Sequence, residues 1–160
     1  MDTGTARLAA LLFAALAGCA SPPPLYGNFL ERTTLQAQSF FALDTAVQLR
    51  SSYSPAAIPL VLPDAGDPFG QALVARLRRM GFAVSEDSAT ELPNALTVRY
   101  AIDGFGVALY RVTLVIRRTR DDAVVSRMSR AFGKQDGVLE AAGPWTRQIA
   151  IEEEGAWTTN

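Results

Sequence analysis

Two stretches of alternating sequence decide the fold, LTVRYAID at residues 96–103 and YRVTLVIR at residues 110–117. In both stretches an apolar side chain occupies every second position, and most of the intervening residues are polar or charged. Successive side chains of a β-strand point to opposite faces, so a period of two predicts half-buried strands. Gly104 and Gly106 mark the turn between them. The sequence therefore predicts an antiparallel pair with one apolar face.

A third strand is expected at residues 124–132, after a turn at residues 119–122. The three strands would form an antiparallel meander with its apolar face toward the core. The inward set is Leu96, Val98, Tyr100, Ile102, Tyr110, Val112, Leu114, Ile116, Met128 and Phe132.

The opposite face of this meander carries Thr97, Arg99, Arg111, Thr113, Arg117, Arg127 and Ser129. One interpretation is a recognition surface for an acidic partner, with Arg99, Arg111, Thr113, Arg117 and Arg127 as the binding residues. The alternative is the ordinary solvated face of an antiparallel sheet. The structural rule favours the solvated face, because arginine and threonine also suit exposed strands.

Upstream of the meander, residues 58–85 predict a strand, helix, strand unit with a right-handed crossover. The strands are placed at 58–62 and 82–85, and the helix at 68–80. Pro59 cannot donate a ladder hydrogen bond, so the first strand lies at a sheet edge or begins near this residue.

The signals that bound this helix are clear. Asp67 is a suitable N-cap, Pro68 suits the first helical position, and Gly81 supplies the left-handed residue that ends a helix. One apolar stripe follows helical spacing: Phe69, Leu73, Leu77 and Met80.

A further helix is expected at residues 34–52, where apolar positions are only partly helix-periodic but no breaker intervenes. The predicted fold class is therefore α+β. It is a two-layer sandwich in which a βαβ unit precedes a three-stranded antiparallel meander, and both helices cover one face of a sheet of about five strands. After Phe132 the periodicity is lost, and Trp145 is expected to close the core.

The amino-acid composition argues against an enzyme, a metalloprotein or a disulfide-stabilised fold. The 160 residues include no histidine and one cysteine, and their net charge is −1. A nucleic-acid binder would be strongly basic, and a disulfide framework needs a second cysteine. The candidate carboxylates for an enzyme are Asp64, Asp67, Asp103, Asp121 and Asp122. Local backbone roles explain four of them, Asp67 as a helix cap, Asp121 and Asp122 as a turn and Asp103 as a strand end. No catalytic residue, cofactor, metal or small-molecule substrate is expected.

The segment Leu16-Ala17-Gly18-Cys19 resembles a bacterial lipobox at the end of an apolar run. We expect residues 1–18 to be a lipoprotein signal peptide, with Cys19 joined to lipid, although an ordinary secretory signal would share most of these features. Ala20 follows the cysteine, and by resemblance to known lipoproteins this favours the outer membrane of a Gram-negative cell. Residues 19–33 would be a Pro-rich tether, 34–148 a single periplasmic domain and 149–160 an acidic, flexible tail.

Several further segments resemble the family of conjugal transfer protein TrbH. They are Tyr26-Gly27-Asn28-Phe29, residues 67–73 through 81–84, Leu109-Tyr110-Arg111-Val112-Thr113-Leu114, Ser129-Arg130-Ala131-Phe132 and Gly143-Pro144-Trp145-Thr146-Arg147. Their order and spacing, together with the lipobox, are more specific than any single segment. The loop between Ser85 and Leu96 is shorter than the insertions some relatives carry, and residues 152–160 extend past the usual end.

This resemblance implies a lipoprotein of the mating-pair-formation apparatus, a type IV secretion system that moves DNA between bacteria. Such a protein would sit in the outer-membrane layer and hold other channel proteins, without chemistry of its own. The remaining alternative is an envelope lipoprotein that binds peptidoglycan or regulates a cell-wall enzyme, because fold alone does not separate the two.

Overall fold

The computed structural model describes residues 25–30, 33–88, 92–106, 108–150 and 157–159. Within these ranges the chain forms two helices and nine strands. The helices are α2 (Leu35–Ser52) and α3 (Pro68–Arg79). The strands are β1 (Gly27–Asn28), β2 (Leu60–Val61), β3 (Val84–Ser85), β4 (Leu96–Gly104), β5 (Leu109–Arg118), β6 (Val124–Gln135), β7 (Val138–Ala141), β8 (Thr146–Ala150) and β9 (Trp157–Thr159). All nine strands belong to one mixed sheet, which confirms the α+β class.

Three long antiparallel strands, β4, β5 and β6, form the centre of the sheet, as predicted for the meander. The strand order is β3-β2-β4-β5-β6-β8-β9. Each outer strand of this centre, β4 and β6, pairs with two short strands along its free edge. β1 and β2 both run parallel to β4, and β7 and β8 both run antiparallel to β6. β2 and β3 are parallel, as the strand, helix, strand unit requires, and β2 begins directly after Pro59.

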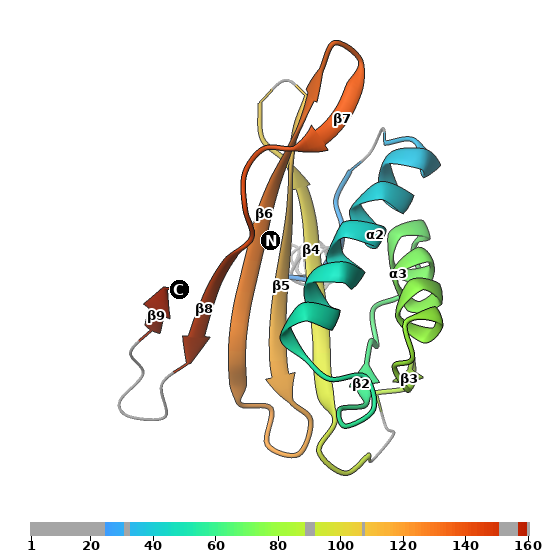
Figure 1. The fold of residues 1–160 in the computed structure, drawn as a ribbon, viewed down its shortest axis with the longest axis vertical. Helices are drawn as coiled ribbons and strands as arrows, with labels where there is room; N and C mark the ends of the chain where they lie inside the picture. Colours follow the sequence, from blue (N-terminus) through green and yellow to red (C-terminus); the bar gives the residue numbers. More distant parts are fainter. Residues whose placement is uncertain (1–24, 31–32, 89–91, 107, 151–156, 160) are drawn as a thin grey trace, which may run out of the picture.

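Both helices lie on the same side of the sheet (Figure 1), and the core fills the space between the two layers. The side chains predicted to point inward are all buried except Tyr110, which is half-buried. Leu114 lies in the central strand and is fully buried. Each helix contributes apolar side chains to the same cluster, Phe41 and Leu49 from α2 and Leu73 and Leu77 from α3. The faces of the meander were therefore predicted correctly.

α3 begins and ends at the predicted signals. The Asp67 Oδ1 accepts hydrogen bonds from the backbone N–H groups of Phe69 (2.8 Å) and Gly70 (3.1 Å). Met80 is the C-cap, and Gly81 follows with φ +93°, a left-handed conformation that favours glycine.

α2 also lies where it was predicted, with Thr34 as its N-cap; the Thr34 Oγ1 accepts from Ala37 N–H at 3.2 Å. Apolar side chains occupy more than one of its faces, because Leu43 and Val47 are exposed while Phe41 and Leu49 are buried. This distribution explains why the sequence of α2 shows only weak helical periodicity.

A partly buried polar contact joins the start of α3 to β4. The Tyr100 hydroxyl lies within hydrogen-bond distance of the Asp64 carbonyl oxygen (2.7 Å) and of the Asp67 carboxylate, whose other oxygen caps α3. Gly70 permits this approach, since a Cβ there would lie 2.5 Å from Ala65 Cα and still closer to the Tyr100 hydroxyl. Tyr100 therefore fixes the height of α3 above the sheet.

The sheet is wider than predicted: about five strands were expected and nine are present. β7 and β8 were missed because they contain only four and five residues and none of their side chains is fully buried, so they lack a strong apolar pattern; β9 has three residues. β1 falls within the predicted tether and pairs with β4, while β9 falls within the predicted tail and pairs with β8. The expectation for Trp145 agrees with the structure, because it packs against the core and its Nε1 donates to the Asp44 Oδ2 at 2.8 Å.

Candidate interaction surfaces

The face of the sheet that the helices leave open carries the predicted basic residues. Arg99 lies on β4, whereas Arg111, Thr113 and Arg117 lie on β5 and Arg127 on β6. The register places Arg99 and Arg127 on either side of Val115, in one row across the three strands. The structure therefore brings these side chains to one face, as the alternation predicted.

Ion pairs neutralise much of this face locally. Arg99 Nη1 lies 3.2 Å from Asp64 Oδ2, and its guanidinium also lies 5.1 Å from the centre of the Tyr26 ring. The Arg111 Nε donates to the Asp103 Oδ1 at 3.1 Å. Arg99 and Arg111 on this face are therefore each paired with a neighbouring aspartate.

Arg117 continues this pattern, because its Nη1 lies 3.1 Å from Asp122 Oδ2. Exposed pairs of this kind contribute only about 0 to 1 kcal/mol each to stability. Matched charges give an acidic partner little to recognise, so the geometry favours the solvated-face interpretation over the binding one.

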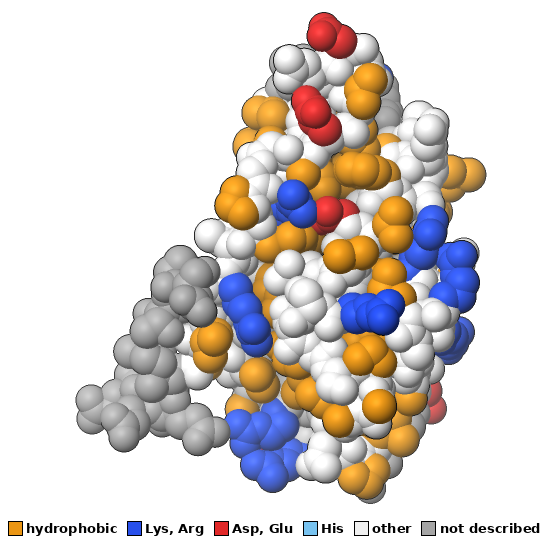
Figure 2. Space-filling model, viewed as in Figure 1, with side chains coloured by type: hydrophobic (Ala, Val, Ile, Leu, Met, Phe, Trp, Pro, Cys, Tyr) orange, Lys and Arg blue, Asp and Glu red, His pale blue; other side chains and the backbone are white. Residues whose placement is uncertain are grey.

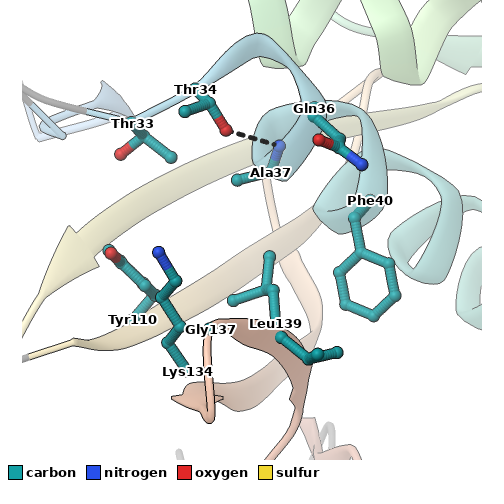
Figure 3. Close-up of a pocket in the computed structure, with 10 residues that line it drawn as sticks. Thr33, Thr34, Gln36, Ala37, Phe40, Tyr110, Lys134, Gly137 and Leu139 are labelled. Atoms are coloured by element: carbon teal, nitrogen blue, oxygen red, sulfur yellow. Dashed lines mark hydrogen bonds between the residues drawn. The ribbon is translucent and has the colours of Figure 1, made fainter.

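A groove on the helix side of the sheet is a stronger candidate for an interaction surface. It has a volume of about 480 Å³ and lies between the first turns of α2, strand β5 and the β6–β7 hairpin (Figure 3). Its lining is Thr33, Thr34, Gln36, Ala37, Phe40, Tyr110, Lys134, Gly137, Val138 and Leu139. Figure 2 shows hydrophobic side chains on the surface between this hairpin and α2.

The β6–β7 hairpin creates the groove by extending beyond the helical layer. Its two turn residues, Asp136 and Gly137, both have positive φ, +51° and +83°. Such values are typical of a tight two-residue hairpin turn, for which Asp-Gly is a preferred sequence. The register then sets Lys134 opposite Leu139, and both line the groove. The Asp-Gly dipeptide is thus the sequence signal that could have revealed this site.

Aromatic contacts hold the floor of the groove in place. The Phe40 ring on α2 meets the Phe132 ring on β6 edge to face, with centroids 6.0 Å apart. Phe41 lies beside both Phe132 (4.8 Å) and Tyr110 (5.6 Å). These aromatic contacts therefore pack α2 against the central strands at the floor of the groove, and the groove above them is open.

Exposed hydrophobic side chains gather at this end of the molecule. Leu35 is in the first turn of α2, Val138 follows the hairpin turn, and Phe105 and Leu109 flank the β4–β5 turn; all four are exposed. Singly exposed apolar residues are ordinary, but several from separate segments at one end are typical of a binding surface.

Comparison with known families assigns the chain. The model of the family described as conjugal transfer protein TrbH matches residues 24–149. The chain belongs to the TrbH family. No curated protein and no solved structure matches it. The match spans both helices and all strands from β1 to β7, together with nearly all of β8, and it includes the residues of the groove.

In this member of the TrbH family, the most strongly perturbed titratable group has a structural role. Burial, followed by the hydrogen bond to Asp67, raises the pKa of Tyr100 far above its ordinary value of 10.0. The hydroxyl is occupied by Asp64 and Asp67, and the side chain is fully buried. It therefore joins two layers of the fold.

The lipidation site predicted at Cys19 lies outside the described residues. Neither described helix is both long and apolar enough to cross a bilayer. Within the described ranges, no cluster of three or more acidic, histidine or cysteine side chains is arranged to hold a metal ion.

Proposed function

We propose that this protein is an outer-membrane lipoprotein of a conjugative type IV secretion apparatus, where it acts as a scaffold for other channel subunits. The family match over residues 24–149 carries the proposal, because it makes the chain a conjugal transfer component. The lipobox at residues 16–19 and Ala20 support the anchor and its location. The protein would work by binding and would catalyse no reaction.

The connection between anchor and fold supports a scaffolding role. Leu25 is six positions after Cys19 (25 − 19 = 6), and Gly27 already pairs with Ala101 of β4. Gly27 is eight positions after Cys19 (27 − 19 = 8), so at about 3.3 to 3.6 Å per extended residue the first paired strand would lie within about 30 Å of the bilayer.

Asn28 and its neighbours fasten this entry segment to the fold. The Asn28 Nδ2 donates to the Gln38 Oε1 on α2 at 3.1 Å, and Phe29 N–H donates to the Ile102 carbonyl at 2.9 Å. The segment that follows the anchor is therefore hydrogen-bonded directly to β4 and α2, and a force on the anchor would act on these two elements.

Affinity purification from detergent-solubilised membranes tests this proposal. The tagged protein should bring down other subunits of the transfer apparatus, identified by mass spectrometry. A Cys19→Ala variant of the same tagged protein is the matched control for the contribution of the anchor. Recovery of cell-wall synthases or muropeptides instead would contradict the proposal and support a cell-wall role.

A further inference from the structure

We propose that the groove between α2 and the β6–β7 hairpin binds an extended segment of another transfer-apparatus protein. This segment would add a strand to β7, place an apolar side chain in the groove and set a carboxylate against Lys134. The inference rests on the proposed function and names the surface through which the scaffold holds a partner.

The outer edge of β7 is available for strand pairing. Among the described strands, β7 pairs with β6 alone. Ala142 N–H donates to the Ala131 carbonyl at 2.9 Å, and bonded and non-bonded pairs alternate along an antiparallel ladder. Gly133 and Glu140 are therefore the next bonded pair, and the N–H and C=O groups of Leu139 and Ala141 point away from β6. An unpaired row of this kind is a template for an incoming strand.

The groove lies beside this edge. Val138 and Leu139 line it from β7, while Gln36, Ala37 and Phe40 line it from α2. In Figure 1 the β7 strand stands between β6 and the first turn of α2. A strand added to β7 would therefore run along the groove. Its alternate side chains would point down toward Phe40 and Leu139, which supply the apolar surface that side-chain recognition needs.

The positive charge of Lys134 favours an acidic side chain on the segment that binds in the groove. It is the only lysine in the 160-residue sequence, in which every other cation is an arginine. Its ammonium reaches the same end of the groove as the Tyr110 hydroxyl (Figure 3). No described acidic side chain forms a salt bridge with it. Lys134 pairs with Leu139, and the next residue of β7, Glu140, points to the opposite face of the hairpin because side chains alternate along a strand. An acidic residue on the incoming strand complements this cation.

Carbodiimide crosslinking in membranes that contain the assembled apparatus tests the contact directly. The reagent joins an amine to a carboxylate that touches it, and Lys134 is the chain's one side-chain amine. We expect a crosslink from Lys134 to an aspartate or glutamate of another transfer protein. Lys134→Arg keeps the charge but removes the reactive amine, so the crosslink should vanish while co-purification persists.

Two further variants separate the charge from the strand pairing. Without crosslinking, Lys134→Glu should lower co-purification of the partner that the crosslink identified about tenfold, whereas Arg50→Glu, at the far end of α2, should leave it unchanged. Ala141→Pro removes an outward N–H at a strand edge, where proline is tolerated, and should lower recovery with the melting temperature preserved.

Two results would overturn this inference while the proposed function stands. One is normal recovery of transfer proteins by both Lys134→Glu and Ala141→Pro. The other is a Lys134 crosslink only to Glu152, Glu153 or Glu154 of a second copy. Absence of any transfer protein from the purified material would overturn both proposals together.

Discussion

Gly70→Ala is expected to destabilise the protein, although the same change inside a helix normally stabilises it. Gly70 is in the first turns of α3 and is buried. Alanine in place of glycine usually adds about 1 kcal/mol of helix stability. Here the new methyl group would lie 2.5 Å from Ala65 Cα, 2.8 Å from Ala65 C and against the Tyr100 hydroxyl. Carbon atoms in contact prefer about 3.5 to 4.0 Å, so α3 or Tyr100 must move.

Two costs oppose the gain in helix propensity. Overpacking of this kind costs about 1 to 3 kcal/mol. Displacement of the Tyr100 hydroxyl from Asp67 and from the Asp64 carbonyl would leave buried polar groups unpaired, at about 1 to 3 kcal/mol. We expect a net loss of about 1 to 5 kcal/mol in the free energy of unfolding.

Urea unfolding followed by circular dichroism measures this loss. Gly66→Ala is the matched control, because a Cβ there meets nothing within 4 Å and its backbone is compatible with alanine. It should be neutral or stabilise by about 0.4 to 1 kcal/mol. In a Tyr100→Phe background the cost of Gly70→Ala should shrink without vanishing, since the Ala65 contact remains. Equal or higher stability of Gly70→Ala would refute the close approach of α3 to β4.

Three further predictions concern the core, the buried tyrosine and the anchor. Leu114→Ala should cost about 2 to 5 kcal/mol in urea unfolding, because Leu114 is fully buried in the central strand; a loss under about 0.5 kcal/mol would mean that the faces of β5 are reversed. The raised pKa of Tyr100 means that the folded protein keeps a proton that the unfolded chain loses above about pH 10, so the free energy of unfolding should fall as the pH rises from there. Tyr100→Phe should flatten this fall, and an equally steep fall in the variant would mean that the hydroxyl is solvated. Cys19→Ser should move the protein out of the outer-membrane fraction with an unchanged circular dichroism spectrum, and unaltered fractionation would argue against lipidation.

The sequence predicts the two-layer core well because burial imposes a pattern on it. Tyr100, Val112 and Leu114 face the helices and are buried, and each occupies an alternate position of its strand. Asp67 and Gly81 mark the two ends of α3, because few other residue types satisfy the backbone geometry that these positions require.

The parts that the sequence does not predict are those without such constraints. β7 and β8 contain four and five residues, none of them fully buried, and β1 contains only two residues, so none of these strands shows a strong apolar pattern. The groove depends on the length of the β6–β7 hairpin relative to α2, which no local pattern encodes. The open-face arginines were placed correctly, but their pairing with Asp64, Asp103 and Asp122 depends on neighbours in space.

The frequency of conjugal transfer tests the central claim most directly. A donor strain that lacks this gene should transfer its conjugative element at background frequency, and the wild-type gene supplied in trans should restore transfer. Transfer at an unchanged frequency from the deletion strain would contradict the assignment of this protein to the conjugation apparatus.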